Sequence, residues 1–365
     1  MKQLPIRVFF VALFALFSSV ACNGADPPDT SDVASYEEQC RLGGLDWELT
    51  DYQTVVAFNP RLDTPDPFDG EHPEGLAFHP WKNLLYVSLA LTGEVAKVDM
   101  NTGEVVKKIP IPFFVPGPCP DALWPAIMGP VTTDLWGNVY LGVGACEEKA
   151  IVRIDRHDEV HVIATLPPEA APNGIALRLG KVYLVDSVLG CVWKANAYGD
   201  GSPAEVLTSD QLLAYVPNDD NVPGSNGNQY NPATDELWIA NASASAIVAI
   251  PFLDRWNSDS PVGAGYVLHD TPVGLDDFAI GPDGTVWGTT DPYQTVLKIS
   301  PDGTTEVALD ASDGLDGPTE AAIRPRFEDG ELVWQICVSN ADFFLFFDST
   351  GNGPNIGCGR LTPSY

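Results

Sequence analysis

Residues 272–304, PVGLDDFAIGPDGTVWGTTDPYQTVLKISPDGT, contain one complete structural unit that the rest of the chain repeats. Short runs rich in apolar residues alternate there with polar turns. The turns at 282–284 and 301–303 both read Pro-Asp-Gly, which supplies the capping side chain and the positive φ that a tight strand reversal needs. The pattern predicts a small antiparallel sheet. Such a sheet has two open edges and too little core to be stable alone, so neighbouring units must complete it.

The same pattern recurs along the chain. The other units are HPEGLAFHPWKNLLYVSLALTGEVAKVD from His72, GPVTTDLWGNVYLGVGACEEKAIVRID from Gly129, PNGIALRLGKVYLVDSVLGCVWKAN from Pro172, SNGNQYNPATDELWIANASASAIVAIP from Ser225 and PTEAAIRPRFEDGELVWQICVSN from Pro318. Aligning the first apolar run of each unit places at one equivalent position Glu74, Gly129, Asn173, Asn226, Asp276 and Thr319. Successive members are separated by 43 residues (Asp276 to Thr319) to 55 residues (Glu74 to Gly129).

A repeat of this length, with several strands in each unit, is typical of a β-propeller. We therefore predict an all-β protein with one six-bladed β-propeller over residues 46–365. A strand-like run at 54–58 belongs to no unit of its own. It is expected to complete the last blade, which would close the ring and remove an open sheet edge. A β-sandwich or a β-helix explains the repeat length less well.

Composition limits the classes of partner. The 365 residues carry a formal net charge of −31 with only 19 Lys and Arg, which excludes the clustered cations that nucleic acids require. The same charge disfavours an anionic membrane surface. The expected partner is a small-molecule substrate or ligand, and a monomer is expected.

The N-terminus is typical of an exported protein. Residues 1–21 have cations, an apolar segment and then small residues, the pattern of a signal peptide. Cys22 stands where a bacterial lipoprotein carries its lipid, so residues 22–45 are interpreted as a lipidated or flexible tether. We expect a protein that is lipid-anchored at the cell envelope, in the periplasm or on the outer surface, with any membrane contact made only through Cys22. The alternative is ordinary secretion.

Six cysteines remain after Cys22 is set aside, and an even number in an exported chain predicts disulfides. Nearness along the chain favours the pairs Cys119–Cys146 and Cys337–Cys358. Cys40 and Cys191 are left as a third pair. The sequence alone leaves all the other pairings open.

The equivalent position of the six units is also the candidate site. In a propeller the innermost strand of each blade lines a central channel, so residues at the starts of these strands converge on the axis. Glu74, Asn173, Asn226 and Asp276 all offer hard oxygen atoms, which suit calcium or another divalent cation. The alternative interpretation is that they are turn residues leading into strands.

Other signals are weaker. Gly129 offers no ligand and Thr319 at best a poor one, while Asp277 and Glu320 are expected to cap strands or support the ligands. The sequence contains neither the GxSxG elbow of serine hydrolases nor the HExxH motif of zinc proteases.

The segments HPEGLAFHP, PNGIALRLGKVYLVDS, SNGNQYNPATDELWIAN and DDFAIGPDGTVWGTT resemble the blade openings of the gluconolactonase and senescence-marker-protein (regucalcin) family. The resemblance extends from about residue 71 to residue 340. It implies a six-bladed propeller with a divalent metal, commonly calcium, at the channel axis. It also implies hydrolysis of lactones or other esters.

Individual residues match this family unevenly. Glu74 matches the first-blade Glu of the family, and Asn173 matches its third-blade Asn. Asn226 stands where the hydrolases usually have an Asp that acts as base or nucleophile, and an amide cannot accept that proton. Asp276 is the remaining carboxylate at the equivalent position and is therefore our candidate catalytic residue. The second-blade Asn of several relatives is replaced by Gly129.

Three functions follow from these observations. The first is an exported, calcium-dependent hydrolase of lactones or related esters. The second is a non-catalytic propeller that binds a ligand at the cell surface, and Asn226 favours it. The third is a cofactor-free cyclase, suggested by a looser resemblance to a fungal branch of the superfamily. Substrate specificity is expected in the segments 113–128 and 211–223.

Overall fold

The structure, a computed structural model, describes residues 46–59, 70–120, 125–217, 222–328, 331–343 and 352–364. The predicted signal peptide, tether, Cys22 and Cys40 lie outside these ranges. None of the described segments forms a helix that is long and apolar enough to span a membrane.

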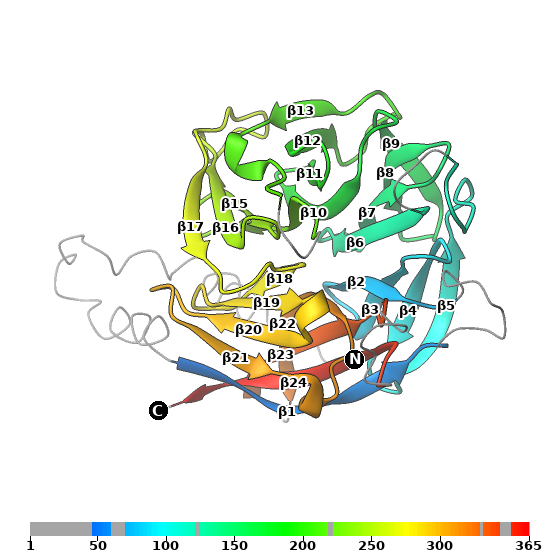
Figure 1. The fold of residues 1–365 in the computed structure, drawn as a ribbon. Helices are drawn as coiled ribbons and strands as arrows, with labels where there is room; N and C mark the ends of the chain where they lie inside the picture. Colours follow the sequence, from blue (N-terminus) through cyan, green and yellow to red (C-terminus); the bar gives the residue numbers. More distant parts are fainter. Residues whose placement is uncertain are drawn as a thin grey trace, which may run out of the picture.

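Six antiparallel four-stranded sheets form the blades of a propeller, arranged around a central channel (Figure 1). Blade 1 consists of β2 (Pro73–Phe78), β3 (Leu84–Leu89), β4 (Glu94–Asp99) and β5 (Glu104–Pro110). Blade 2 consists of β6 (Ile127–Thr133), β7 (Val139–Gly144), β8 (Lys149–Ile154) and β9 (Val160–Thr165). Blade 3 consists of β10 (Pro172–Arg178), β11 (Lys181–Asp186), β12 (Cys191–Asn196) and β13 (Glu205–Thr208). Blade 4 consists of β14 (Ser225–Asn231), β15 (Glu236–Asn241), β16 (Ala246–Pro251) and β17 (Tyr266–Asp270). Blade 5 consists of β18 (Phe278–Ile280), β19 (Val286–Thr290), β20 (Thr295–Ile299) and β21 (Thr305–Leu309).

Blade 6 is closed by both ends of the described chain. Its strands, from the channel outward, are β22 (Pro318–Glu328), β23 (Glu331–Asn340), β24 (Asn355–Ser364) and β1 (Asp46–Ala57). The run 54–58, predicted to complete the last blade, lies largely in β1, which pairs with β24. The predicted six blades and the predicted ring closure are therefore confirmed. The remaining elements are the short 3-10 helices η1 (Gln211–Leu213), η2 (Asp291–Tyr293) and η3 (Ala311–Asp313).

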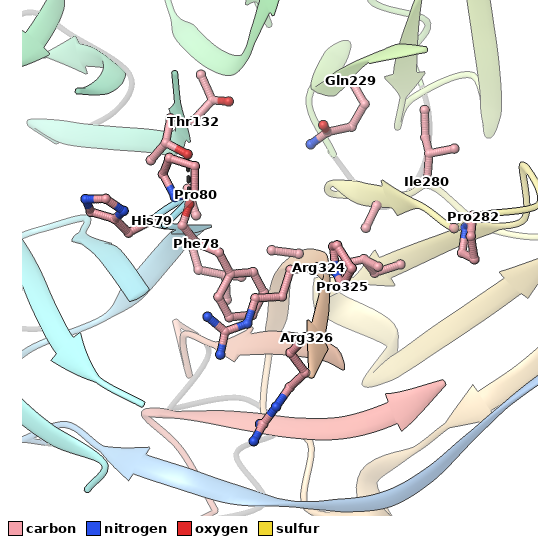
Figure 2. Close-up of a pocket in the computed structure, with 18 of the residues that line it drawn as sticks. Phe78, His79, Pro80, Thr132, Gln229, Ile280, Pro282, Arg324, Pro325 and Arg326 are labelled. Atoms are coloured by element: carbon pink, nitrogen blue, oxygen red, sulfur yellow. Dashed lines mark hydrogen bonds between the residues drawn. The ribbon is translucent and has the colours of Figure 1, made fainter. Parts of the chain in front are cut away.

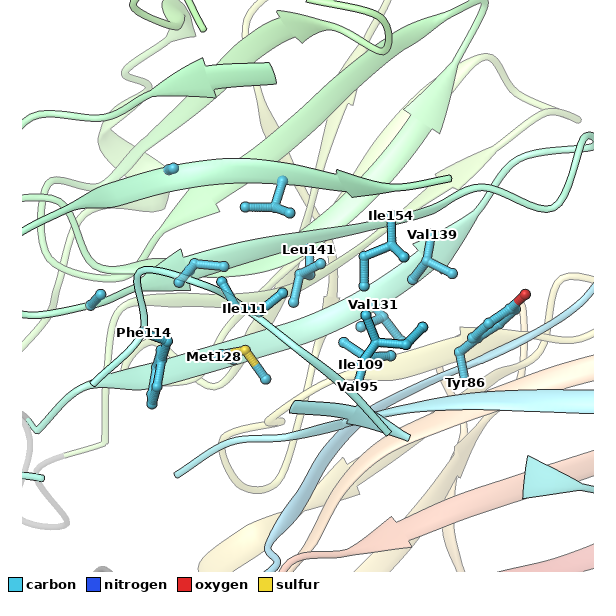
Figure 3. Close-up of a cluster of buried hydrophobic side chains, with 14 of the residues drawn as sticks. Tyr86, Val95, Ile109, Ile111, Phe114, Met128, Val131, Val139, Leu141 and Ile154 are labelled. Atoms are coloured by element: carbon cyan, nitrogen blue, oxygen red, sulfur yellow. The ribbon is translucent and has the colours of Figure 1, made fainter. Parts of the chain in front are cut away.

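The apolar core lies between the blades rather than at the centre. On β3, Tyr86 packs toward blade 2, while Leu85 and Val87 pack toward blade 6. Figure 3 shows the layer between blades 1 and 2, where Val95 and Met128 belong to one buried cluster. Because each sheet is covered on both faces, its middle strands are largely apolar.

Disulfides Cys119–Cys146 and Cys337–Cys358 are both formed, which confirms the two pairings that nearness favoured. The third predicted pairing, Cys40 with Cys191, is wrong. Cys191 carries a free thiol that is buried in the apolar layer between blades 2 and 3. Its environment is that of a core residue, which the count of cysteines could not show.

Candidate functional site

The starts of the inner strands approach one another closely around the axis. A Cβ atom on Gly174 would lie 2.5 Å from the backbone oxygen of Asn226, and one on Gly227 would lie 2.1 Å from Asp277 Oδ1. Only glycine fits at such contacts. The glycines that follow Asn173 and Asn226 are therefore required by the approach of the next blade, and they bring the equivalent positions of neighbouring blades side by side.

Hydroxyl groups then fix these strand starts. Ser88 Oγ of β3 donates to Gly129 O in the next blade (2.9 Å), and Ser187 Oγ, just after β11, donates to Ser225 O (2.7 Å). Thr319 Oγ1 donates to Glu74 O (2.8 Å) and so joins blade 6 to blade 1. Thr319, a poor ligand by sequence, positions the backbone of Glu74.

The axis carries a cluster of carboxyl groups from blades 1, 5 and 6. We define the axial cluster by its carboxyl-bearing members together with the amide that contacts them: Glu74, Asn226, Asp276, Asp277, Asp291 and Glu320. Asn226 Nδ2 donates to Asp276 Oδ1. Three of the four predicted ligands, Glu74, Asn226 and Asp276, are thus brought together.

The acidic groups of the axial cluster repel one another. Burial raises the pKa of the Glu74 carboxyl well above its ordinary value, and the charge of Asp276 raises it further. Burial raises the pKa of Asp276 to about 7, against the lowering effect of the Asn226 amide. Burial and then the charge of Asp276 also raise the pKa of Asp291. Asp276 is therefore the centre of the electrostatic interactions, and these carboxylates cannot all be ionised without a compensating cation.

Several oxygen atoms of the cluster have no hydrogen-bond partner among the described residues. They are Glu74 Oε2, Asn226 Oδ1, Asp277 Oδ2 and Asp291 Oδ1, all buried. Buried polar atoms are nearly always paired, so a group of them in one place calls for a partner. Carboxylate and amide oxygens are the ligands that calcium takes in irregular geometry. The chemistry of these donor atoms therefore suits a divalent cation.

The side chain of Asn173 bonds to a residue outside the axial cluster. Its side chain is half-buried, and its Nδ2 donates to Ser187 Oγ (3.2 Å). That bond orients the amide but involves only its nitrogen atom. Its predicted role as a ligand, like that of the other three residues, stays a prediction.

Sequence reasoning missed Asp291. This residue lies in η2, the connection between β19 and β20, whereas the repeat was aligned on the starts of the inner strands. Asp277 and Glu320 were expected to cap strands or to support the ligands. Asp277 Oδ1 does accept the Phe278 N–H (2.7 Å), and Glu320 Oε2 accepts the Leu76 N–H (2.5 Å), which joins blade 6 to blade 1.

A second group of potential ligands lies away from the axis, between β8 and β9. Ligand atoms of Asp155, Glu159 and His161 lie within 4.8 Å of one another. Asp155 Oδ1 accepts the N–H groups of His157 (2.8 Å) and Glu159 (3.0 Å), as a capping residue does in a strand turn. This local hydrogen bonding accounts for the arrangement, so it carries no functional argument.

The axial carboxyl groups predict an unusual pH dependence for the calcium-free protein. Their folded-state pKa values lie above the unfolded values near 4, so their contribution to stability is present below pH 4 and is lost as pH rises. We expect the free energy of unfolding to fall from pH 4 to above pH 7, by about 1.4 kcal/mol per pH unit for each such group.

Denaturation of chelator-treated protein at constant ionic strength measures this effect. Glu74→Gln should make the fall shallower, which separates it from the general repulsion of an acidic chain. Saturating calcium should remove it. A calcium-free stability that rises steadily from pH 4 to pH 7 would contradict the account.

Comparisons with known proteins agree with the fold. No protein-family model matches the chain, and no curated protein matches its sequence. Among solved structures, it is similar to a calcium-binding protein, regucalcin, from Agrobacterium tumefaciens, with 15% identity over 86% of this chain and 98% of that one and a TM-score of 0.58. A gluconolactonase from Xanthomonas campestris has 15% identity over 93% of this chain and 96% of that one, with a TM-score of 0.56. A luciferin-regenerating enzyme has 14% identity over 87% and 95%, with a TM-score of 0.55.

The chain therefore has the six-bladed propeller fold of the regucalcin and gluconolactonase structures, as the sequence motifs predicted. At this level of identity the likeness establishes the fold alone.

Proposed function

We propose that this protein is an exported, calcium-dependent hydrolase of lactones or related esters. The observation that supports it most is the group of buried, unpaired oxygen atoms contributed by Glu74, Asn226 and Asp291 to the axial cluster. The fold is that of a protein described as a gluconolactonase and of one described as calcium-binding. Two disulfides suit an oxidising compartment, and a lipid on Cys22 is part of the proposal.

The residues of the axial cluster and Asn173 would have two roles, cation binding and proton transfer. Glu74, Asn173, Asn226 and Asp276 would hold the cation, and Asp291 would add a further carboxylate. A bound calcium ion polarises a carbonyl group and stabilises negative charge on its oxygen. Asp276 Oδ1 is held by the Asn226 amide, and the Asp276 carboxylate would accept a proton from the attacking water. We assign Asp276 as the catalytic base.

A second candidate is a non-catalytic propeller that binds a ligand at the cell surface. Asn226 favours it, because the hydrolases that the chain resembles usually have a carboxylate there, and here an amide contacts Asp276 instead. On this alternative any cation at the axis is structural.

A substrate panel separates the two candidates. We expect purified protein to hydrolyse at least one class among aldonolactones, acyl lactones and aryl esters, with turnover lost in a calcium chelator and restored by added calcium. Magnesium serves as the matched control ion. Calcium binding without turnover of any ester or lactone would favour the binding propeller, and turnover unaffected by the chelator would overturn the calcium dependence.

A further inference from the structure

A cavity of about 770 Å³ opens among the inner strands, mostly beside their later residues. Its walls come from the later residues of the inner strands, including 76–78 of β2, 131–133 of β6 and 229–231 of β14. The axial cluster instead lies where these strands begin. Figure 2 shows side chains from several blades, among them Thr132, Gln229 and Arg324, around a common space. Glu320 of the axial cluster also lines the cavity, so the two sites lie along the same channel, and Arg324 lies farther along β22 than Glu320.

Blade 6 contributes an extended hairpin to the wall of this cavity. β22 has 11 residues and β23 has 10, whereas the inner strands of the other blades have 3 to 7. The extra length of this hairpin carries residues 324–327 to the mouth, where they line the cavity. The propeller repeat does not require such an extension.

Arg324 lies on this wall and is held by neutral groups. Its Nε and Nη2 donate to Gln335 Oε1 (3.0 and 2.8 Å), and Nη2 also donates to Asn83 Oδ1. Its guanidinium carbon lies 4.2 Å from the centre of the Phe78 ring. No carboxylate among the described residues forms an ion pair with Arg324. The guanidinium is thus fixed in place while its charge stays uncompensated.

Arg178, an arginine with a purely structural role, provides a comparison for Arg324. Arg178 ends the inner strand of blade 3, and its Nε and Nη2 donate to the two carboxylate oxygens of Asp235, at 2.8 and 3.0 Å. Arg324 has no such partner, and burial lowers its pKa to about 10. Leaving a half-buried cation without an anion costs free energy of folding. The chain contains 50 acidic residues that could have supplied a partner.

We propose that this cavity binds a small organic anion that carries one carboxylate on an aromatic or aliphatic body. The carboxylate would accept hydrogen bonds from Arg324, and the body would pack against the apolar side chains of Phe78, Ile280 and Trp81. One fixed guanidinium balances one negative charge, so the site suits a carboxylate better than a doubly charged phosphate. The site does not depend on the function proposed for the axial cluster.

The test compares two probes of the same shape by titration calorimetry on the calcium-loaded protein. Naphthalene-2-carboxylate should bind about tenfold or more tightly than the neutral naphthalene-2-carboxamide. Arg324→Gln should abolish that preference. Arg360→Gln is the matched control in the same blade, because Arg360 pairs with Glu328 and does not line the cavity, and it should leave the preference intact.

A second measurement does not require any variant to fold. Rising salt should weaken binding of the carboxylate and leave binding of the carboxamide unchanged, because only the first involves an ion pair. Equal affinities for the two probes, no binding of the carboxylate, or binding that is lost in Glu74→Gln would each overturn the proposal. The last result would place the anion at the axial cluster instead.

Discussion

Asp276→Asn is expected to lower turnover of the best ester or lactone substrate by about 10²–10⁴-fold, the range that loss of a general base produces. The side chain keeps its size and can still contact Asn226, but an amide cannot accept a proton. Folding should be retained, because the substitution replaces a buried carboxyl group, whose pKa burial raises to about 7, with a neutral amide. The measurement is kcat at saturating calcium, so that weaker ion binding is not mistaken for lost chemistry.

The matched control is Asp302→Asn in the same blade. Asp302 Oδ1 accepts the Thr304 N–H (2.9 Å) in the turn between β20 and β21, a bond that Asn can also accept. This variant should keep wild-type turnover. If Asp276→Asn retains kcat within a few-fold of wild type, Asp276 is not the base, and Asp291 becomes the next candidate.

Arg178→Met is expected to destabilise the fold by about 3–5 kcal/mol, the cost of leaving one member of a buried ion pair alone. The Arg178 side chain is fully buried, and its Asp235 partner is only 5% exposed. Arg178 Nη1 also donates to Asn257 O (2.9 Å), so the residue holds the long connection between β16 and β17 against blade 3. The free energy of unfolding from denaturant titration measures the loss.

A surface pair provides the control for this prediction. Lys181 pairs with Asp259 at 2.9 Å, but Asp259 is 57% exposed, so Lys181→Met should cost less than about 1 kcal/mol. The double variant Arg178→Met with Asp235→Asn should recover part of the loss, because it removes the unpaired charge. A cost below 1 kcal/mol for Arg178→Met alone would contradict a structural role for this pair.

The repeat made the architecture predictable from the sequence. Turn signals such as Pro-Asp-Gly at 282–284 and alternating apolar runs are local, and six similar units that cannot stand alone leave few arrangements. The same alignment brought Glu74, Asn226 and Asp276 to one position, because equivalent residues of a ring are neighbours in space. Disulfide Cys337–Cys358 followed from nearness along the chain.

Features outside the repeat were not predictable. Asp291 contributes to the axial cluster from a connection, and the repeat, which was aligned on the starts of the inner strands, does not include that connection. The extension of β22 and β23 has no counterpart in the other repeat units, so the repeat pattern did not indicate a role for Arg324. The mistaken pairing of Cys191 has a related cause, since only packing shows that its thiol faces an apolar layer.

The central claim is that the axial cluster binds calcium. The most direct test is a thermal melt of chelator-stripped protein titrated with calcium, with magnesium and zinc as comparison ions. At calcium well above its dissociation constant we expect Tm to rise by about 5–10 °C, and the rise should disappear in the Glu74→Gln and Asp276→Asn double variant. An unchanged Tm with every ion, or a calcium response that the double variant retains, would contradict the claim.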